Sequence, residues 1–105
     1  MTAPSQIIIH RPGSLEELPK HVSGKVLIVT DLGIVEAGHF ARAAALLEDV
    51  VVFDQVRENP TESDVAQCAK FARAMSPDFI VGLGGGSSMD TAKGALFSVS
   101  YTHLT

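Results

Sequence analysis

The sequence has one cysteine, no cluster of basic residues and no long apolar run. Cys68 has no disulfide partner within the 105-residue chain, and 8 Lys and Arg against 12 Asp and Glu leave a formal net charge of -4. That balance gives nucleic-acid binding little support. The apolar runs are far too short for a membrane span, and the opening residues MTAPSQ lack the basic and apolar regions of a signal peptide. We therefore predict a cytoplasmic protein without a nucleic-acid or membrane partner.

Patterns that hold metals or activate nucleophiles are missing as well. The histidines show neither HxxxH nor HExxH spacing and are predicted to lie on the surface: His10, His21, His39 and His103. Cys68 falls on the apolar stripe of a predicted helix, which favours a packed core thiol. Ser87 and Ser88 lack a visible His or Asp partner, so we predict no catalytic residue and no metal ligand in this chain.

Short apolar runs alternate with amphipathic segments, and the 46% hydrophobic and 19% charged residues suit one globular domain. Strands are predicted at residues 7–9, 25–30, 50–53 and 79–81. Helices are predicted at 34–48, at 61–75 with Thr61 as cap, and from Ser87 onward, with a short helical turn at 15–18. This alternation predicts an α/β fold with a mainly parallel sheet and helices on both faces.

The most informative stretch is residues 78–94, DFIVGLGGGSSMDTAKG. It reads as a buried strand, a turn at Gly84-Gly85-Gly86 and a helix start at Ser87-Ser88. Glycines let the backbone approach a ligand without a Cβ in the way, and the free N–H groups and dipole of a helix N-terminus favour an anion. The stretch matches neither GxGxxG nor GxxxxGK[ST]. A capped turn would explain it too, but three glycines and two serines exceed what a cap needs, so we predict phosphate binding.

Two polar residues follow other predicted strands. Asp31 comes directly after the strand at 25–30, and Asn59 lies in the loop after the strand at 50–53. Because the carboxyl ends of parallel strands share one edge, both residues could line a site with the glycine loop. A carboxylate at Asp31 can accept hydrogen bonds from the ribose hydroxyls of adenosine and would repel a 2′-phosphate, which favours NAD over NADP. An N-cap or Asx-turn role for Asp31 is equally compatible with the sequence.

The helix after the glycines carries two further charged residues. Asp90 lies three residues after Ser87, which is the spacing of a capping box, and we predict that structural role for it. Lys93 is predicted to lie on the exposed face of the same helix.

With GGGSSMDTAKGA the sequence resembles the iron-containing, or group III, alcohol dehydrogenase family. That family carries a GGGSxxDxxK stretch, which is matched here by Gly84, Gly85, Gly86, Ser87, Asp90 and Lys93. KVLIVTD resembles its early strand, which ends in the Asp that meets the adenosine ribose, here Asp31. VFDQVRENPT resembles its loop with an Asn-Pro-Thr sequence, here Asn59 to Thr61. The three matches follow in order and cover roughly residues 7 to 97.

The resemblance implies an NAD(P)-dependent oxidoreductase with a Rossmann-like domain for the dinucleotide and a helical domain that holds a divalent metal, iron or zinc. Hydride passes between the nicotinamide and an alcohol or aldehyde whose oxygen the metal polarises. By this likeness the cofactor-binding residues are Asp31, Asn59, Gly84, Gly85, Gly86, Ser87 and Ser88, with NAD preferred to NADP. Family members are longer, and the metal domain is missing here. We therefore expect residues 1–97 to be a truncated dinucleotide-binding domain, inactive alone, and 98–105 to be a non-native or disordered tail.

Two other interpretations stay open at this point. Enzymes of the dehydroquinate synthase or glycerol-phosphate dehydrogenase type share the architecture and a similar glycine loop. A non-catalytic nucleotide-binding fragment is the third possibility. An incomplete domain leaves a sheet edge and apolar helix faces uncovered, which favours association, including a homo-oligomer.

Overall fold

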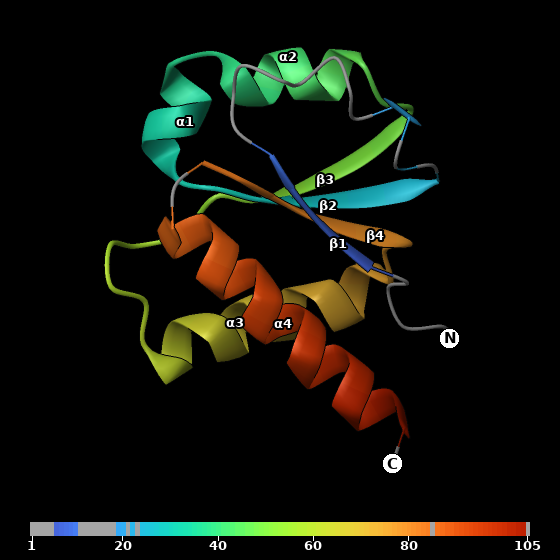
Figure 1. Ribbon diagram of the computed structural model, residues 1–105, viewed down its shortest axis with the longest axis vertical. Helices are drawn as coiled ribbons and strands as arrows, with labels where there is room; N and C mark the ends of the chain where they lie inside the picture. The colour runs from blue at the N-terminus through green and yellow to red at the C-terminus, as the bar shows by residue number, and fades with distance from the viewer. Residues whose placement is uncertain (1–5, 11–18, 21, 23, 85, 105) are drawn as a thin grey trace.

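The computed structural model describes residues 6–10, 19–20, 22, 24–84 and 86–104. Four strands and four helices follow one another in the order β1 (Gln6–His10), β2 (Lys25–Val29), α1 (Leu32–Glu36), α2 (His39–Ala45), β3 (Asp49–Phe53), α3 (Glu62–Met75), β4 (Phe79–Leu83) and α4 (Gly86–Leu104). The strands form one sheet in the order β1-β4-β2-β3, and every neighbouring pair is parallel (Figure 1). The predicted parallel α/β fold is confirmed, while the helical turn expected at 15–18 lies outside the described residues.

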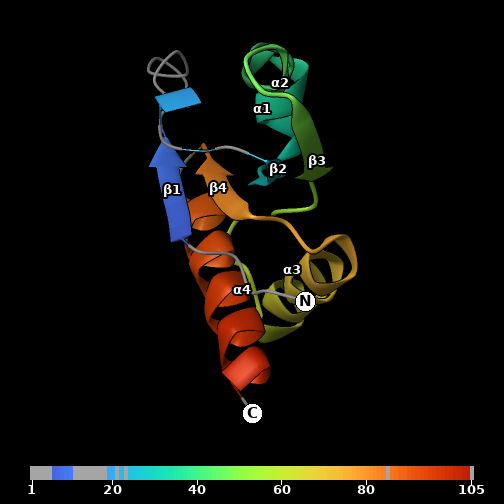
Figure 2. The ribbon, with the colours of Figure 1, turned by 90° about the vertical axis from the view of Figure 1, so that its right-hand side faces the viewer.

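Helices cover both faces of this sheet. Figure 2 shows α1 and α2 on one side and α3 and α4 on the other. Along β2, Leu27 and Val29 contact the α3–α4 layer, whereas Val26 and Ile28 contact the α2 layer. Both sets of side chains are buried, which explains why residues 26–29, VLIV, are continuously apolar instead of alternating.

Small side chains form the contact between α3 and α4. Cys68, Ala69 and Ala72 of α3 and Ala92 and Ala95 of α4 are all buried in one cluster. The core position predicted for Cys68 is confirmed, and burial raises the pKa of its thiol to about 12. Burial thus favours the protonated thiol, which is a poor nucleophile compared with a thiolate.

The single helix predicted at 34–48 is wrong, because the structure has two helices there. Helix α1 ends at Glu36 and α2 begins at His39, with a turn at Ala37 and Gly38 between them. Gly38 adopts φ 88°, a left-handed conformation that interrupts a right-handed helix. The apolar spacing of this segment did not reveal the break because Phe40 and Leu47 still pack against the same cluster beneath α2.

Helix α3 begins and ends where the sequence predicts. The Thr61 side chain accepts a hydrogen bond from the Asp64 backbone N–H, and the Asp64 carboxylate accepts one from the Thr61 N–H at 2.8 Å, which completes a capping box. Ser76 ends the helix in a left-handed conformation with φ 50°, directly before Pro77.

Helix α4 continues to Leu104. The backbone of residues 98–104 is thus helical, where the sequence predicted a disordered or non-native tail; the foreign origin of that segment stays a prediction. Within the described part of the chain, no helix is long and apolar enough to cross a membrane.

Candidate functional site

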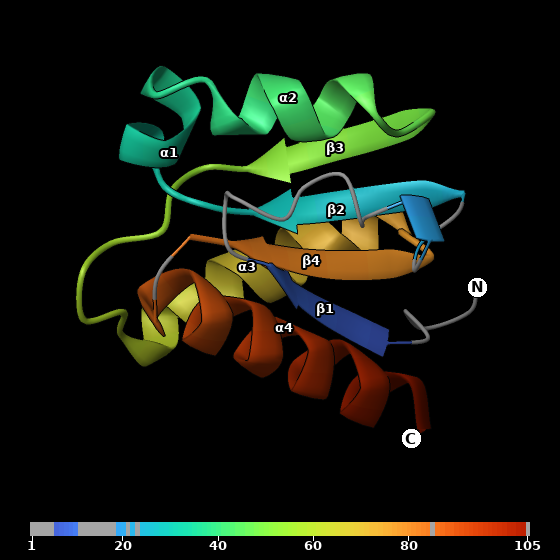
Figure 3. The ribbon, with the colours of Figure 1, turned by 45° about the horizontal axis from the view of Figure 1, so that its top comes forward.

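The carboxyl ends of the strands meet at one edge of the sheet. Figure 3 shows the arrowheads of β2, β3 and β4 pointing toward the starts of α1 and α4 and toward the loop that follows β3. Thr30 joins these ends, because its Oγ1 donates to the Leu83 carbonyl at 2.8 Å and its N–H donates to the Phe53 carbonyl at 2.9 Å. Its carbonyl in turn accepts from the Val56 N–H at 3.3 Å. The segments after three strands are therefore held together at this edge.

A cleft of about 300 Å³ opens at this edge. Its lining comes from all three segments: Asp31, Val56, Arg57, Glu58, Gly86 and Ser87. We refer to it as the strand-end cleft. Its place agrees with the position of ligands in open α/β sheets, outside the carboxyl ends of the strands.

Asp31 is the N-cap of α1, and it also faces the glycine loop. One carboxylate oxygen, Oδ1, accepts from the Ile34 N–H at 2.9 Å. The other, Oδ2, lies 3.7 Å from where a Cβ on Gly84 would sit. The cap role that the sequence left open is thus observed, and it leaves a second oxygen directed toward the cleft side of the loop.

Gly84 is required by its conformation and by its neighbours. Its φ is +131°, and a Cβ would lie 3.2 Å from Ser88 Oγ and 3.3 Å from Ile34 Cγ1. Gly86 differs, because a Cβ built there meets nothing within 4 Å. Gly84 therefore serves the packing of the loop, whereas the absence of a side chain at Gly86 leaves open space beside the start of α4. Gly85 lies outside the described residues.

The predicted Ser87–Asp90 capping box is wrong. Helix α4 begins at Gly86, two residues earlier than a Ser87 cap requires, so both serines lie within its first turn. The Ser87 carbonyl accepts from Thr91 Oγ1 at 2.8 Å, and Asp90 is exposed one turn into the helix. The two additional helical residues place Asp90 beyond the first turn, too far from the helix end to accept from its free N–H groups.

Ser88 carries a buried hydroxyl without a partner. The side chain is 1% exposed, and among the described residues its Oγ makes no hydrogen bond. A buried hydroxyl that stays unpaired costs roughly 1–3 kcal/mol. An orphaned donor beside Gly84 at the start of a helix fits a group that accepts a hydrogen bond, such as a phosphate.

Asn59 is not brought into the cleft. It is exposed, with φ 56°, a conformation that asparagine tolerates better than most residues, and it is not part of the cleft lining. The structure thus gathers Asp31, Gly84, Gly86, Ser87 and Ser88 at one edge and leaves Asn59 beside it.

Arg57 is a cleft residue that the sequence analysis missed. Its Nε and Nη2 donate to Asp64 Oδ1 at 3.1 and 2.6 Å. The Thr61 backbone N–H and the Arg57 guanidinium hold the pKa of Asp64 below its ordinary value. A basic residue two positions before Asn59, in a chain with few cations, is the signal that could have pointed to it.

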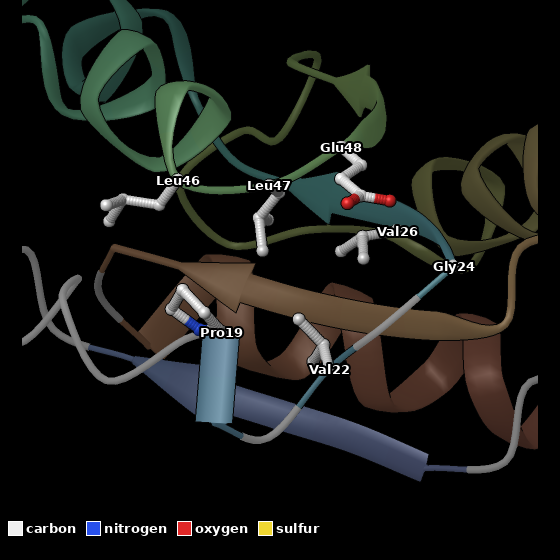
Figure 4. A pocket seen from close by; sticks show the side chains of 7 residues that line it. All are labelled: Pro19, Val22, Gly24, Val26, Leu46, Leu47 and Glu48. Atoms are coloured by element: carbon white, nitrogen blue, oxygen red, sulfur yellow. The ribbon is translucent and has the colours of Figure 1, made fainter.

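A second cavity, of about 260 Å³, lies at the opposite end of β2 (Figure 4). Leu46, Leu47 and Glu48 border it at the end of α2, with Val22 and Val26 facing them. Among the described lining residues the one charged side chain is the carboxylate of Glu48, which would repel a phosphate. This cavity therefore lacks the features of an anion site.

The residues that the structure describes include no group of three or more His, Cys, Asp or Glu able to hold a metal ion. The described residues therefore do not provide a set of ligands that fits the metal of the family. We derive no chemistry through a metal in this chain.

The parallel sheet with helices on both faces and a cleft at the strand ends defines an α/β protein of the Rossmann-like class. The sequence matches the pattern of the iron-containing alcohol dehydrogenases over residues 4–105. The chain belongs to this family. That match favours it over the dehydroquinate synthase and glycerol-phosphate dehydrogenase types that the sequence left open.

Individual relatives agree with the assignment. The chain is 46% identical over 70 residues to a 4-hydroxybutyrate dehydrogenase from Cupriavidus necator, an alignment that covers 65% of this chain and 18% of that protein. A mutant of a halo-thermophilic archaeal alcohol dehydrogenase from a Red Sea brine pool superposes with a TM-score of 0.73 at 33% identity, over 90% of this chain and 25% of the other. A sulfoacetaldehyde reductase from Bifidobacterium kashiwanohense, solved in complex with NAD+, superposes with a TM-score of 0.65 at 25% identity. The superposition covers 90% of this chain and 26% of the reductase. The alignments therefore cover only 18% to 26% of the length of these relatives.

Proposed function

We propose that this chain is the dinucleotide-binding part of an NAD-dependent, metal-dependent alcohol dehydrogenase. The observation that carries the proposal is the strand-end cleft, which Asp31, Gly86 and Ser87 line. Gly84 and the unpaired Ser88 hydroxyl lie next to these residues. The family membership and the NAD+ complex of a related reductase support the choice of ligand.

Different residues in and beside the cleft would bind different parts of the cofactor. The N–H groups at the start of α4 and the Ser88 hydroxyl would hold the pyrophosphate, which the helix dipole also favours. Asp31 Oδ2 would accept hydrogen bonds from the adenosine ribose while Oδ1 remains engaged with Ile34. Gly84, Gly85, Gly86, Ser87 and Asn59 complete the proposed set.

In the proposed reaction, bound NAD supplies the hydride acceptor for an alcohol, or as NADH the donor for an aldehyde. The described part of this chain positions the cofactor, and it contains no group of three or more His, Cys, Asp or Glu that could hold a metal ion. The metal, iron or zinc, and the substrate pocket belong by this proposal to the remainder of a longer enzyme. We also propose a cytoplasmic location, residues 1–97 as the native part of the domain, and association through its uncovered edges into a homo-oligomer.

Fluorescence titration of NADH tests the proposal. The chain should show saturable binding that is weak, since much of the enzyme is missing. Gly86→Asp places a carboxylate beside the start of α4, in space that is open, and should remove binding without unfolding the chain. Equal NADH binding by the wild-type chain and Gly86→Asp would contradict the proposal.

A further inference from the structure

Arg57 lines the strand-end cleft and is a residue to which no part of the proposed dinucleotide site has yet been assigned. It lines the cleft with Gly86 and Ser87 of α4, although it belongs to the loop between β3 and α3. Its side chain is 68% exposed, so the guanidinium is open to a ligand.

The guanidinium is also held in place. Asp64 Oδ1 accepts from its Nε and Nη2, at 3.1 and 2.6 Å. Asp64 is itself fixed, because its side chain is 8% exposed and its Oδ2 accepts from the Thr61 N–H at 2.8 Å. Two of the five N–H donors of Arg57 are thus used by a fixed carboxylate, and three remain for another acceptor. An oriented guanidinium loses less freedom on binding an anion than a mobile one does.

The charges around the cleft indicate why a bound pyrophosphate needs a cation such as Arg57. Asp31 and Glu58 place two carboxylates in the lining, and Arg57 is the one basic side chain among the six lining residues. A pyrophosphate brings two further negative charges. The dipole of α4 supplies only about half an elementary charge at its N-terminus. A cation on the loop side of the cleft offsets the repulsion that the two carboxylates create.

We propose that Arg57 binds the dinucleotide, its guanidinium pairing with the pyrophosphate, and that Asp64 is the positioning residue that holds the guanidinium toward the cleft. This inference rests on the proposed dinucleotide site and deepens it, since it assigns the cation of that site. The pairing is of the guanidinium–phosphate type, for which arginine is suited by its planar array of donors.

The test compares ligands with and without the pyrophosphate. Calorimetric titrations of the full chain with ADP and with adenosine should show that Arg57→Gln weakens ADP binding roughly three- to tenfold and leaves adenosine binding unchanged. Arg57→Lys keeps the charge and loses the planar donors, so its affinity for ADP should lie between those of the wild type and Arg57→Gln. Arg73→Gln removes the same charge from the far end of α3 and should change neither affinity. Added salt should weaken ADP binding more in the wild type than in Arg57→Gln.

Other outcomes overturn the inference in distinguishable ways. An equal loss for ADP and adenosine would mean that Arg57 acts only through the fold of its loop. An affinity for ADP that is unchanged in Arg57→Gln would exclude the pairing of the guanidinium with the pyrophosphate. A loss confined to NADPH, with NADH unaffected, would place the guanidinium at the 2′-phosphate instead. Wild-type chain that binds neither NADH nor ADP would contradict the proposed function and this inference with it.

Discussion

Asp31 holds one carboxylate oxygen on the α1 backbone and directs the other toward Gly84, so its two roles can be separated by substitution. Asparagine is as good an N-cap as aspartate, whereas alanine cannot cap. Asp31→Asn should therefore keep the free energy of unfolding within about 0.5 kcal/mol of wild type, and Asp31→Ala should lower it by about 1 kcal/mol.

The preference for NADH over NADPH should depend on the negative charge at position 31, whereas stability depends on the N-cap. In both variants the affinity for NADPH should come closer to the affinity for NADH than it does in the wild type. The reason is that the carboxylate that repels a 2′-phosphate is gone. Urea unfolding and paired NADH and NADPH titrations measure the two effects. A wild-type preference for NADH that persists in Asp31→Asn would show that the carboxylate does not select the cofactor.

The glycines on either side of position 85 should respond to alanine in opposite ways. At Gly84 the methyl group meets Ser88 Oγ and Ile34 Cγ1 at 3.2 and 3.3 Å, on a backbone with φ +131°. Gly84→Ala should cost about 1–3 kcal/mol of folding stability. At Gly86 the methyl group meets nothing within 4 Å, so Gly86→Ala should keep or slightly raise stability while it weakens NADH binding. Thermal melts and NADH titrations of both variants would separate packing from ligand approach, and equal destabilisation would contradict the distinction.

At the scale of the element, the start of α3 makes stability depend on acidic pH. The Thr61 N–H and Arg57 keep the pKa of Asp64 below the ordinary value of 3.8, so its ionised form is favoured by folding. This contribution is fully present above pH 3.8 and is lost as pH falls through the lower folded pKa. Asp64→Asn should therefore be less stable than wild type at neutral pH, and the difference should shrink in acid.

Urea unfolding at neutral pH and at a series of pH values below about 4 measures that difference. Asp90→Asn, which removes an exposed carboxylate from α4, controls for the loss of one negative charge. A difference between wild type and Asp64→Asn that stays constant down to acid pH would show that the carboxylate does not carry the stability.

The break between α1 and α2 rests on backbone conformation alone. Gly38 has φ +88°, and a Cβ added there meets nothing within 4 Å. Gly38→Ala should therefore cost about 1–2 kcal/mol through the left-handed backbone, and Gly38→Asn should cost less because asparagine tolerates that region. Chemical unfolding of the two variants tests this, and an unchanged or raised stability of Gly38→Ala would mean that the segment can form the single helix predicted from its sequence.

Strands were easier to predict than helix ends. Continuous apolar runs such as VLIV at residues 26–29 indicate burial on both faces directly. The Thr61 cap with Asp64 three residues later indicates a helix start from local chemistry. The turn at Gly38 and the turn at Gly84 before α4 depend on positive φ angles, which glycine permits without dictating. The Arg57–Asp64 pair joins a loop to a helix seven residues later, and side-chain reach of this kind leaves no periodic pattern.

At the scale of the molecule, parallel strand order brought together residues that are far apart in sequence. Asp31 and Gly84 were predicted to share an edge because they follow parallel strands, and the structure places the Asp31 carboxylate beside Gly84. Asn59 follows a strand as well, but it is the preceding loop residues Arg57 and Glu58 that line the cleft, and Asn59 does not. Topology therefore predicts which edge holds a site, whereas loop conformation decides which residues reach it.

The central claim is that the strand-end cleft binds a dinucleotide, and an NMR titration of the labelled chain with NADH tests it most directly. The account predicts saturable shifts of the backbone amides of Asp31, Arg57, Gly86 and Ser88, with those of Val26 and Leu47 at the opposite cavity unchanged. Shifts centred on Val26 and Leu47, or no shifts at any concentration of NADH, would contradict it.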